Sequence, residues 1–374
     1  MAGIYIHIPF CKQRCTYCDF YTEVAPDYVS ELVQALIKEL KMRSEYIQEP
    51  VSTIYFGGGT PSILSLAQLS NIFDAINTTY NVEVDAEITL ESNPDDLSIT
   101  YLSEIAQLPV NRLSIGIQSF DNDDLKRLNR RHTSIQAVEA VKNAQEAGFN
   151  NISIDLIYGL PLQTTEKWLK QVTKAFELNI QHISAYGLTY EKGTALWNQR
   201  YEGVVKEIED DTMNEMYSEM LKSMKINDFI AYEISNFSKH GFQSRHNSSY
   251  WKFEPYLGIG PSAHSFDGAS RQWNVSSISQ YINALKNNRK YFDKEILTTN
   301  DRYNDYIMVS LRTAEGSDLN YIKSAFGHSY KTFFLKSLNS FLQSNHVEFR
   351  DNRYKLTENG IYISNLIISE LMKV

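Results

Sequence analysis

Residues 4–18 read Ile4-Tyr5-Ile6-His7-Ile8-Pro9-Phe10-Cys11-Lys12-Gln13-Arg14-Cys15-Thr16-Tyr17-Cys18. The first five have the β-branched, apolar composition of a buried strand. The three cysteines are the only ones in the chain, and an odd number within eight residues cannot form a set of disulfides. Thiols separated by three and then two residues can instead fold around one inorganic centre. We therefore predict a strand that leads directly into a metal-binding loop.

Five more strand-like runs follow, and amphipathic helical patterns separate them. The predicted strands are Ile4–Ile8, Thr53–Phe56, Glu87–Leu90, Arg112–Ile117, Ser153–Ile157 and His182–Tyr186. The predicted helices lie near residues 28–46, 66–80, 101–108, 135–147 and 166–178, with Gly148 just after the fourth. Such alternation is typical of a parallel sheet, and right-handed crossovers curl six units into a partial (β/α)6 barrel. Functional residues are then expected at the carboxyl ends of the strands.

After Tyr190 the alternation of predicted strands and helices ends. A long helix is predicted over residues 207–226, opened by the acidic run Glu207–Asp211, whose carboxylates favour the positive end of a helix. Further helices are predicted near residues 302–312, 319–326 and 332–343. They precede a hairpin over 347–356 and a last helix capped by Thr357. We therefore expect an α/β barrel over 1–190, an extension over 191–299 and a winged-helix-like α+β domain over 300–374.

Composition limits the partners and the compartment. The chain has 374 residues, with 36 Lys and Arg against 45 Asp and Glu, a net charge of −9. This balance argues against binding nucleic acid through bulk charge. The N-terminus has no basic segment of a signal peptide, and no apolar run reaches the roughly 18 residues of a membrane span. We expect a cytoplasmic protein, whose thiols stay reduced and available as ligands.

The cysteine spacing alone leaves the metal open. Structural zinc usually takes four protein ligands, and His7 as a fourth would lie inside the predicted strand, away from the loop. An ordinary cubane cluster takes four cysteinates. Three cysteinates would leave one iron open, which suggests ligand binding or catalysis.

Polar groups stand at the ends of the other predicted strands. Gly57-Gly58-Gly59-Thr60-Pro61 follows the second strand, and its glycines let the backbone approach a ligand closely. Glu91 follows the third strand and can accept two hydrogen bonds from a ribose. Gln118 ends the fourth, with Arg130 beyond it. Asp155 lies within an apolar strand, where a carboxylate is costly unless it is paired or functional.

The cysteine spacing, the aromatic Tyr17 before the third cysteine and the glycine loop together resemble the radical S-adenosylmethionine (SAM) superfamily. The resemblance implies a [4Fe-4S] cluster on Cys11, Cys15 and Cys18, whose open iron chelates SAM and whose electron splits it to a 5′-deoxyadenosyl radical. The SAM contacts that it implies are Tyr5, Tyr17, Gly58, Gly59, Thr60, Glu91, Gln118, Arg130 and Asp155, with Gly187 as a further backbone contact.

Several longer strings resemble the oxygen-independent coproporphyrinogen III dehydrogenase family through about residue 190, and more loosely beyond. They are Tyr5–Cys11, Gly57–Pro61, Glu91–Pro94, Gly116–Phe120 and Asp155–Pro161. Two features depart from those enzymes: Phe20 stands where they have a further cysteine, and the cysteine loop begins already at residue 11.

The string Arg245-His246-Asn247-Ser248-Ser249-Tyr250-Trp251 resembles instead a motif of the HemW-type heme chaperones in the same family. This implies heme bound near His246, Tyr250 and Trp251, with His264 as a rival iron ligand, and delivery to respiratory apo-hemoproteins with transient membrane contact. We therefore favour a heme chaperone, which leaves the enzyme question and a homodimer open. The alternatives are radical decarboxylation of coproporphyrinogen III and a zinc-binding barrel without redox chemistry.

Overall fold

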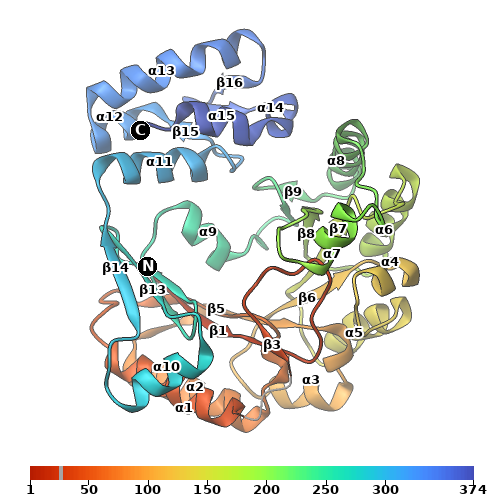
Figure 1. The fold of residues 1–374 in the computed structure, drawn as a ribbon, viewed down its shortest axis with the longest axis vertical. Coiled ribbons are helices and arrows are strands. Elements are labelled where there is room, and N and C mark those ends of the chain that lie inside the picture. Colours follow the sequence, from red (N-terminus) through yellow and green to blue (C-terminus); the bar gives the residue numbers. More distant parts are fainter. Residues whose placement is uncertain (25–27) are drawn as a thin grey trace.

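A computed structural model describes residues 1–24 and 28–374, and its centre is a curved parallel sheet (Figure 1). Six neighbouring strands run parallel in chain order: β1 (Ala2–Ile8), β4 (Val51–Gly58), β5 (Val82–Ser92), β6 (Arg112–Gln118), β7 (Ile152–Tyr158) and β8 (His182–Gly187). The helices between them are α1 (Val29–Met42), α2 (Leu66–Thr79), α3 (Ile99–Ile105), α4 (Asn122–Arg127), α5 (Ser134–Glu146) and α6 (Thr165–Glu177). The predicted partial (β/α)6 barrel is confirmed.

The apolar faces predicted from periodicity form the core of this barrel. Leu32, Leu36 and Leu40 repeat along one face of α1 and are fully buried against the sheet. Helix α2 begins with a capping box, in which Ser65 and Gln68 exchange hydrogen bonds. Gly148 follows α5 with a φ of 95°, as expected for a residue that ends a helix.

Residues beyond β8 extend this sheet at both edges. Strand β11 (Tyr256–Ile259) pairs parallel with β1, and β12 (His264–Phe266), β13 (Ser270–Asn274) and β14 (Phe292–Ile296) continue it antiparallel. Strands β10 (Asn236–Ser238) and β9 (Ile230–Ala231) follow β8 at the opposite edge. The helices of this region are α7 (Ala195–Tyr201), α8 (Asp210–Ile226), α9 (Arg245–Trp251) and α10 (Ile278–Lys286). The predicted boundaries at residues 190 and 300 remain predictions.

Helix α8 corrects one detail of the sequence-based expectation. It begins at Asp210, so Glu207, Ile208 and Glu209 precede it, and only Asp210 and Asp211 place carboxylates in its first turn. None of the described residues belongs to a helix that is both long and apolar enough to cross a bilayer.

The C-terminal part packs its own hydrophobic core at one end of the molecule (Figure 1). Its elements are α11 (Thr299–Ser310), β15 (Ser317–Asp318), α12 (Leu319–Phe326), α13 (His328–Gln343), β16 (Val347–Arg350), β17 (Arg353–Leu356), α14 (Glu358–Tyr362) and α15 (Ser364–Leu371). The hairpin is confirmed: Asp351 and Asn352 have φ values of 54° and 61°, as a type I′ turn requires. The last predicted helix is in fact two, because the chain bends at Ile363.

Candidate functional site

The cysteine loop follows β1 and the short strand β2 (Phe10–Cys11), which pairs with β3 (Glu23–Val24). It is fastened to the segment that follows α4, where the Leu128 carbonyl accepts from Thr16 N at 3.1 Å and Asn129 Nδ2 donates to the Arg14 carbonyl at 2.8 Å. These bonds hold the three free thiols at the carboxyl ends of the strands, as predicted.

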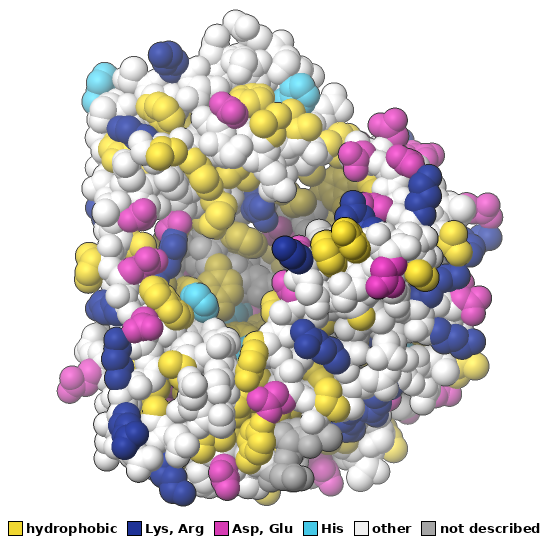
Figure 2. Space-filling model, in the orientation of Figure 1, with side chains coloured by type: hydrophobic (Ala, Val, Ile, Leu, Met, Phe, Trp, Pro, Cys, Tyr) yellow, Lys and Arg dark blue, Asp and Glu magenta, His cyan; other side chains and the backbone are white. Residues whose placement is uncertain are grey.

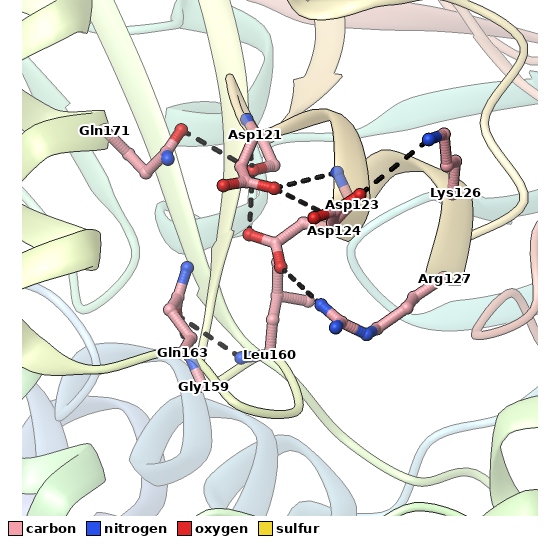
Figure 3. A network of polar contacts seen from close by, with 10 residues as sticks. Asp121, Asp123, Asp124, Lys126, Arg127, Gly159, Leu160, Gln163 and Gln171 are labelled. Carbon is pink, nitrogen blue, oxygen red and sulfur yellow. Dashed lines mark hydrogen bonds and ion pairs between the residues drawn. The ribbon is translucent and has the colours of Figure 1, made fainter.

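A polar network in turn fixes α4 (Figure 3). The Asp121 carboxylate caps the helix by accepting from the backbone N–H groups of Asp123 at 2.8 Å and Asp124 at 3.2 Å. One turn later, Arg127 pairs with Asp124 at 3.3 Å. Because the cysteine loop is bonded to the end of α4, this network also limits how far the loop can shift.

Three free cysteine thiols in one loop are a donor set that suits an iron–sulfur cluster, whose protein ligands are cysteinates. Within residues 1–24 and 28–374, no three His, Cys, Asp or Glu side chains converge as ligands of one ion would. A cubane spreads its cysteine ligands over different iron atoms, so its thiols can stay farther apart. Burial raises the pKa of Cys18 to about 11, so that its thiol becomes a ligand only when a metal replaces the proton.

Two polar groups reach the cysteine sulfurs, one from the loop after β4 and one from the segment that follows α4. The Thr60 hydroxyl donates to Cys11 Sγ at 3.5 Å, and Arg130 Nη1 donates to Cys15 Sγ at 3.4 Å. The Arg130 guanidinium also donates to Asn93 Oδ1 at 2.7 Å and to the Gly116 carbonyl. Arg130 therefore connects the cysteine loop with the ends of β5 and β6.

The glycine loop after β4 permits a close approach that side chains would prevent. Gly58 has a φ of 112°, and a Cβ there would lie 2.6 Å from the His7 ring. A Cβ on Gly59 would lie 2.6 Å from the Phe10 carbonyl oxygen. The chain can therefore pass against the cysteine segment only with glycines at these positions.

Glu91 lies beside this loop, inside the barrel. Its carboxylate accepts from the Tyr55 hydroxyl at 2.7 Å and from Gly58 N at 3.2 Å. Burial, opposed by the Tyr55 hydrogen bond, raises the pKa of Glu91 to about 7, and the negative charge of Asp155 adds to the increase. Burial likewise raises the pKa of Asp155 to about 6. Asp155 is thus close enough to Glu91 for its charge to act on it, and both carboxylates can accept hydrogen bonds from ligand hydroxyl groups.

The remaining predicted SAM contacts differ in their surroundings. Tyr17 lies next to Cys15 and Arg130, and burial raises its pKa. Gln118 ends β6 with a φ of 67°, its amide near Gly116. The Tyr5 hydroxyl and His7 Nδ1 form a hydrogen bond of 2.9 Å. The side chains nearest to a Cβ at Gly187 would be those of Tyr158 and Met213.

Sequence reasoning missed three polar residues of this site. Asn93 orients Arg130 and donates to Thr60 Oγ1 at 3.2 Å, and Tyr55 bonds Glu91. Arg112 is buried, and its Nε has no partner among the residues that the structure describes. Its charge lowers the pKa values of Glu91 and Asp155 against the effect of burial. Arg112 could have been noticed, because a charged residue opens an otherwise apolar strand.

Helix α9 carries the predicted heme motif and lies between the barrel and the C-terminal domain (Figure 1). His246 is only 1% exposed and stacks on the Tyr55 ring at 5.0 Å. Both of its ring nitrogens are engaged: Nδ1 with Thr53 Oγ1 at 2.8 Å and Nε2 with the Tyr250 hydroxyl at 2.9 Å. Burial lowers the pKa of His246 to about 3, so the ring is neutral.

Next to α9 lies a cavity of about 800 Å³. Tyr250 and Trp251 of the predicted motif line it, together with His264 and Trp273 from the edge strands and Met308 from α11. Figure 2 shows that this face of the molecule is hollowed below the C-terminal domain, with hydrophobic side chains in and around the hollow. The two halves of the predicted heme motif thus have different surroundings: His246 faces the barrel interior, and Tyr250 and Trp251 reach the cavity.

Known proteins match this chain along its whole length. Residues 5–175 match the radical SAM superfamily, and residues 297–363 match the HemN C-terminal domain. The heme chaperone HemW of Lactococcus lactis is 32% identical over 369 residues, which are 98% of this chain and 96% of the relative. HemW of Bacillus subtilis is 32% identical, with 100% of this chain and 99% of the relative covered. HemW of Escherichia coli is 38% identical over 70% of this chain and 69% of its own.

A solved structure shows the same fold. Coproporphyrinogen III oxidase (HemN) of Escherichia coli, a radical SAM enzyme, superposes with a TM-score of 0.85 over 100% of this chain and 90% of its own, at 23% identity. At that identity the likeness concerns the fold alone, whereas the full-length relatives are HemW proteins. The chain therefore belongs to the HemW family of radical SAM proteins.

Proposed function

We propose that this protein is a heme chaperone, which binds heme and passes it to apo-hemoproteins. The observation that carries this proposal is the full-length similarity to heme chaperones HemW from two bacteria. The aromatic cavity beside α9 supports it, because flat apolar side chains suit a porphyrin and Tyr250 and Trp251 belong to the motif shared with that family.

Membership of the radical SAM superfamily implies a [4Fe-4S] cluster and SAM, and we assign their ligands to the site described above. Cys11, Cys15 and Cys18 would bind three irons, and the glycine loop, Glu91 and Asp155 would hold SAM. When bound, such a cluster supplies an electron for cleavage of the SAM sulfonium. Arg130 would donate a hydrogen bond to the Cys15 sulfur of such a cluster.

Respiratory apo-hemoproteins are the acceptors that the family resemblance suggests. Because such acceptors are anchored in membranes, delivery to them implies transient contact of this protein with a membrane surface. The choice of acceptors and the membrane contact both follow from the resemblance to the family.

The test begins with anaerobic reconstitution of the full chain with iron and sulfide. Hemin is then titrated, and the loaded protein is mixed with an apo-hemoprotein whose reconstituted spectrum is distinct. Stoichiometric binding followed by transfer supports the proposal. Absence of heme binding would overturn it, and conversion of coproporphyrinogen III to a decarboxylated product with SAM would assign the enzymatic function instead.

A further inference from the structure

A histidine binds heme iron through a ring nitrogen that is free of other hydrogen bonds, and this requirement separates His246 from His264. His246, in the family motif, has none: Thr53 and Tyr250 occupy its two ring nitrogens, and 1% of the residue is exposed. Binding iron through Nε2 would break the bond to Tyr250 and require the ring to leave its stack with Tyr55. Because both ring nitrogens of His246 are already hydrogen-bonded and the ring is buried, we expect His246 to hold neighbouring side chains in place and not to bind iron.

Helix α9 is also fixed at its N-terminus, which opposes such a movement. The buried Glu87 carboxylate of β5 accepts from the backbone N–H groups of Arg245 and His246, each at 3.0 Å. The Ser244 side chain caps the helix by accepting from Asn247 N at 3.2 Å. His246 therefore stays inside the barrel unless the first turn of α9 detaches.

His264 differs in each of these respects. It begins β12, is exposed, and makes no side-chain hydrogen bond within the described part of the chain. Its ring stacks on Trp273 at 6.3 Å with 29° between the planes, which orients it along the cavity wall. An imidazole with free nitrogens on the wall of a cavity is available to a metal.

The cavity itself suits a flat, largely apolar ligand. Its volume of about 800 Å³ lies in the range of small-molecule sites, and it lies between the extended sheet and the C-terminal domain, where such sites are frequent. Tyr250, Trp251 and Trp273 supply aromatic surface, and Met308, which is 41% exposed, adds a thioether. The Trp251 indole N–H is buried without an acceptor within residues 1–24 and 28–374.

The charged groups of the cavity largely pair with one another. Arg271 pairs with Asp305 of α11 and, at 3.7 Å, with Glu295 of β14. Glu254 is the other acidic residue of the wall. The surface left for a ligand is therefore mainly aromatic, and among the described residues His264 is the one histidine that lines the cavity.

We propose that heme binds in the cavity between α9, β12–β13 and α11, with His264 as its axial iron ligand. His246 then acts indirectly, because its Nε2 holds the Tyr250 hydroxyl and so positions the aromatic wall. This inference rests on the proposed heme-binding function and specifies its site.

The test compares hemin titrations of the full-length protein and three variants, with the ligand identified by absorption and electron paramagnetic resonance spectra. His264→Ala is expected to lose the signature of imidazole-ligated iron. His246→Gln is expected to keep that signature while its affinity changes. His240→Ala serves as the matched control, because His240 is also exposed but does not line the cavity, and it should resemble the unaltered protein.

Each outcome decides between two sites. An unchanged imidazole signature in His264→Ala overturns the proposal, and its loss in His246→Gln alone would return the iron to the family motif. If His246→Gln fails to fold, His264→Ala still decides, since an exposed side chain can be removed without disturbing the core. If the unaltered protein binds no hemin, the proposed function fails together with this site.

A second measurement tests the cavity without altering any histidine. Val309→Trp adds volume to a wall residue that is 6% exposed, and it should weaken hemin binding while the imidazole signature of the remaining complex is kept. Unchanged hemin affinity in a folded Val309→Trp protein would place heme elsewhere.

Discussion

Glu87 provides the sharpest test of how α9 is held. Its carboxylate, in a residue that is 6% exposed, is the acceptor for the backbone N–H groups of Arg245 and His246. In Glu87→Ala both groups lose their acceptor inside the protein, at about 1–3 kcal/mol each and therefore about 2–6 kcal/mol together. Glu87→Gln keeps one oxygen and should lose roughly half as much.

Hydrogen exchange followed by mass spectrometry measures this loss directly. Since about 1.4 kcal/mol corresponds to a tenfold change, a loss of about 2–6 kcal/mol should make the peptide that contains residues 245–251 exchange at least about 30-fold faster in Glu87→Ala. Asp85→Asn is the matched control: Asp85 pairs with Arg245 at 3.7 Å, but its side chain is 85% exposed, and exposed ion pairs contribute little. Unchanged exchange in Glu87→Ala, or equal acceleration in Asp85→Asn, would show that Glu87 does not hold the first turn of α9.

Three further predictions concern the cluster and its surroundings. Cys15→Ala should abolish the cluster, and a variant that retains its full iron content after reconstitution would overturn the ligand assignment. Arg130→Ala removes the donor to Cys15 Sγ and should speed iron loss under air, whereas Arg131→Ala, which breaks an ion pair with Asp95, should not; equal rates would contradict the role of Arg130. Because burial raises the pKa of Glu91 from 4.5 to about 7, its contribution to apo-protein stability is present below pH 4.5 and lost as the pH rises through 7. Glu91→Gln should therefore reduce the fall in urea midpoint between pH 5 and pH 8, and an unchanged fall would argue against this titration.

The six parallel strands could be predicted because each is a short run rich in β-branched or other apolar residues, and helical patterns separate these runs. The edge strands could not. Strand β13 alternates buried polar residues such as Gln272 and Asn274 with half-buried ones, and their partners lie far away in the sequence. Asn274, for example, donates to Glu39 of α1 at 2.9 Å, a contact that no local pattern reveals.

In the candidate site, too, local motifs could be predicted from the sequence, whereas contacts between distant segments could not. The three cysteines and the glycine loop are local motifs, so their chemistry was visible in the sequence. Asn93 and Tyr55 act by orienting residues of other segments, and their roles emerge only when the strand ends meet. His246 illustrates the opposite case: its motif was recognisable, but its burial and its two hydrogen bonds depend on β4 and on packing inside the barrel.

The most direct test of the central claim is heme transfer by the anaerobically reconstituted full chain. We expect one heme bound per chain and its appearance in an added apo-hemoprotein, observed as the acceptor's own spectrum. Formation of decarboxylated porphyrinogen from coproporphyrinogen III, with no heme reaching the acceptor, would contradict it.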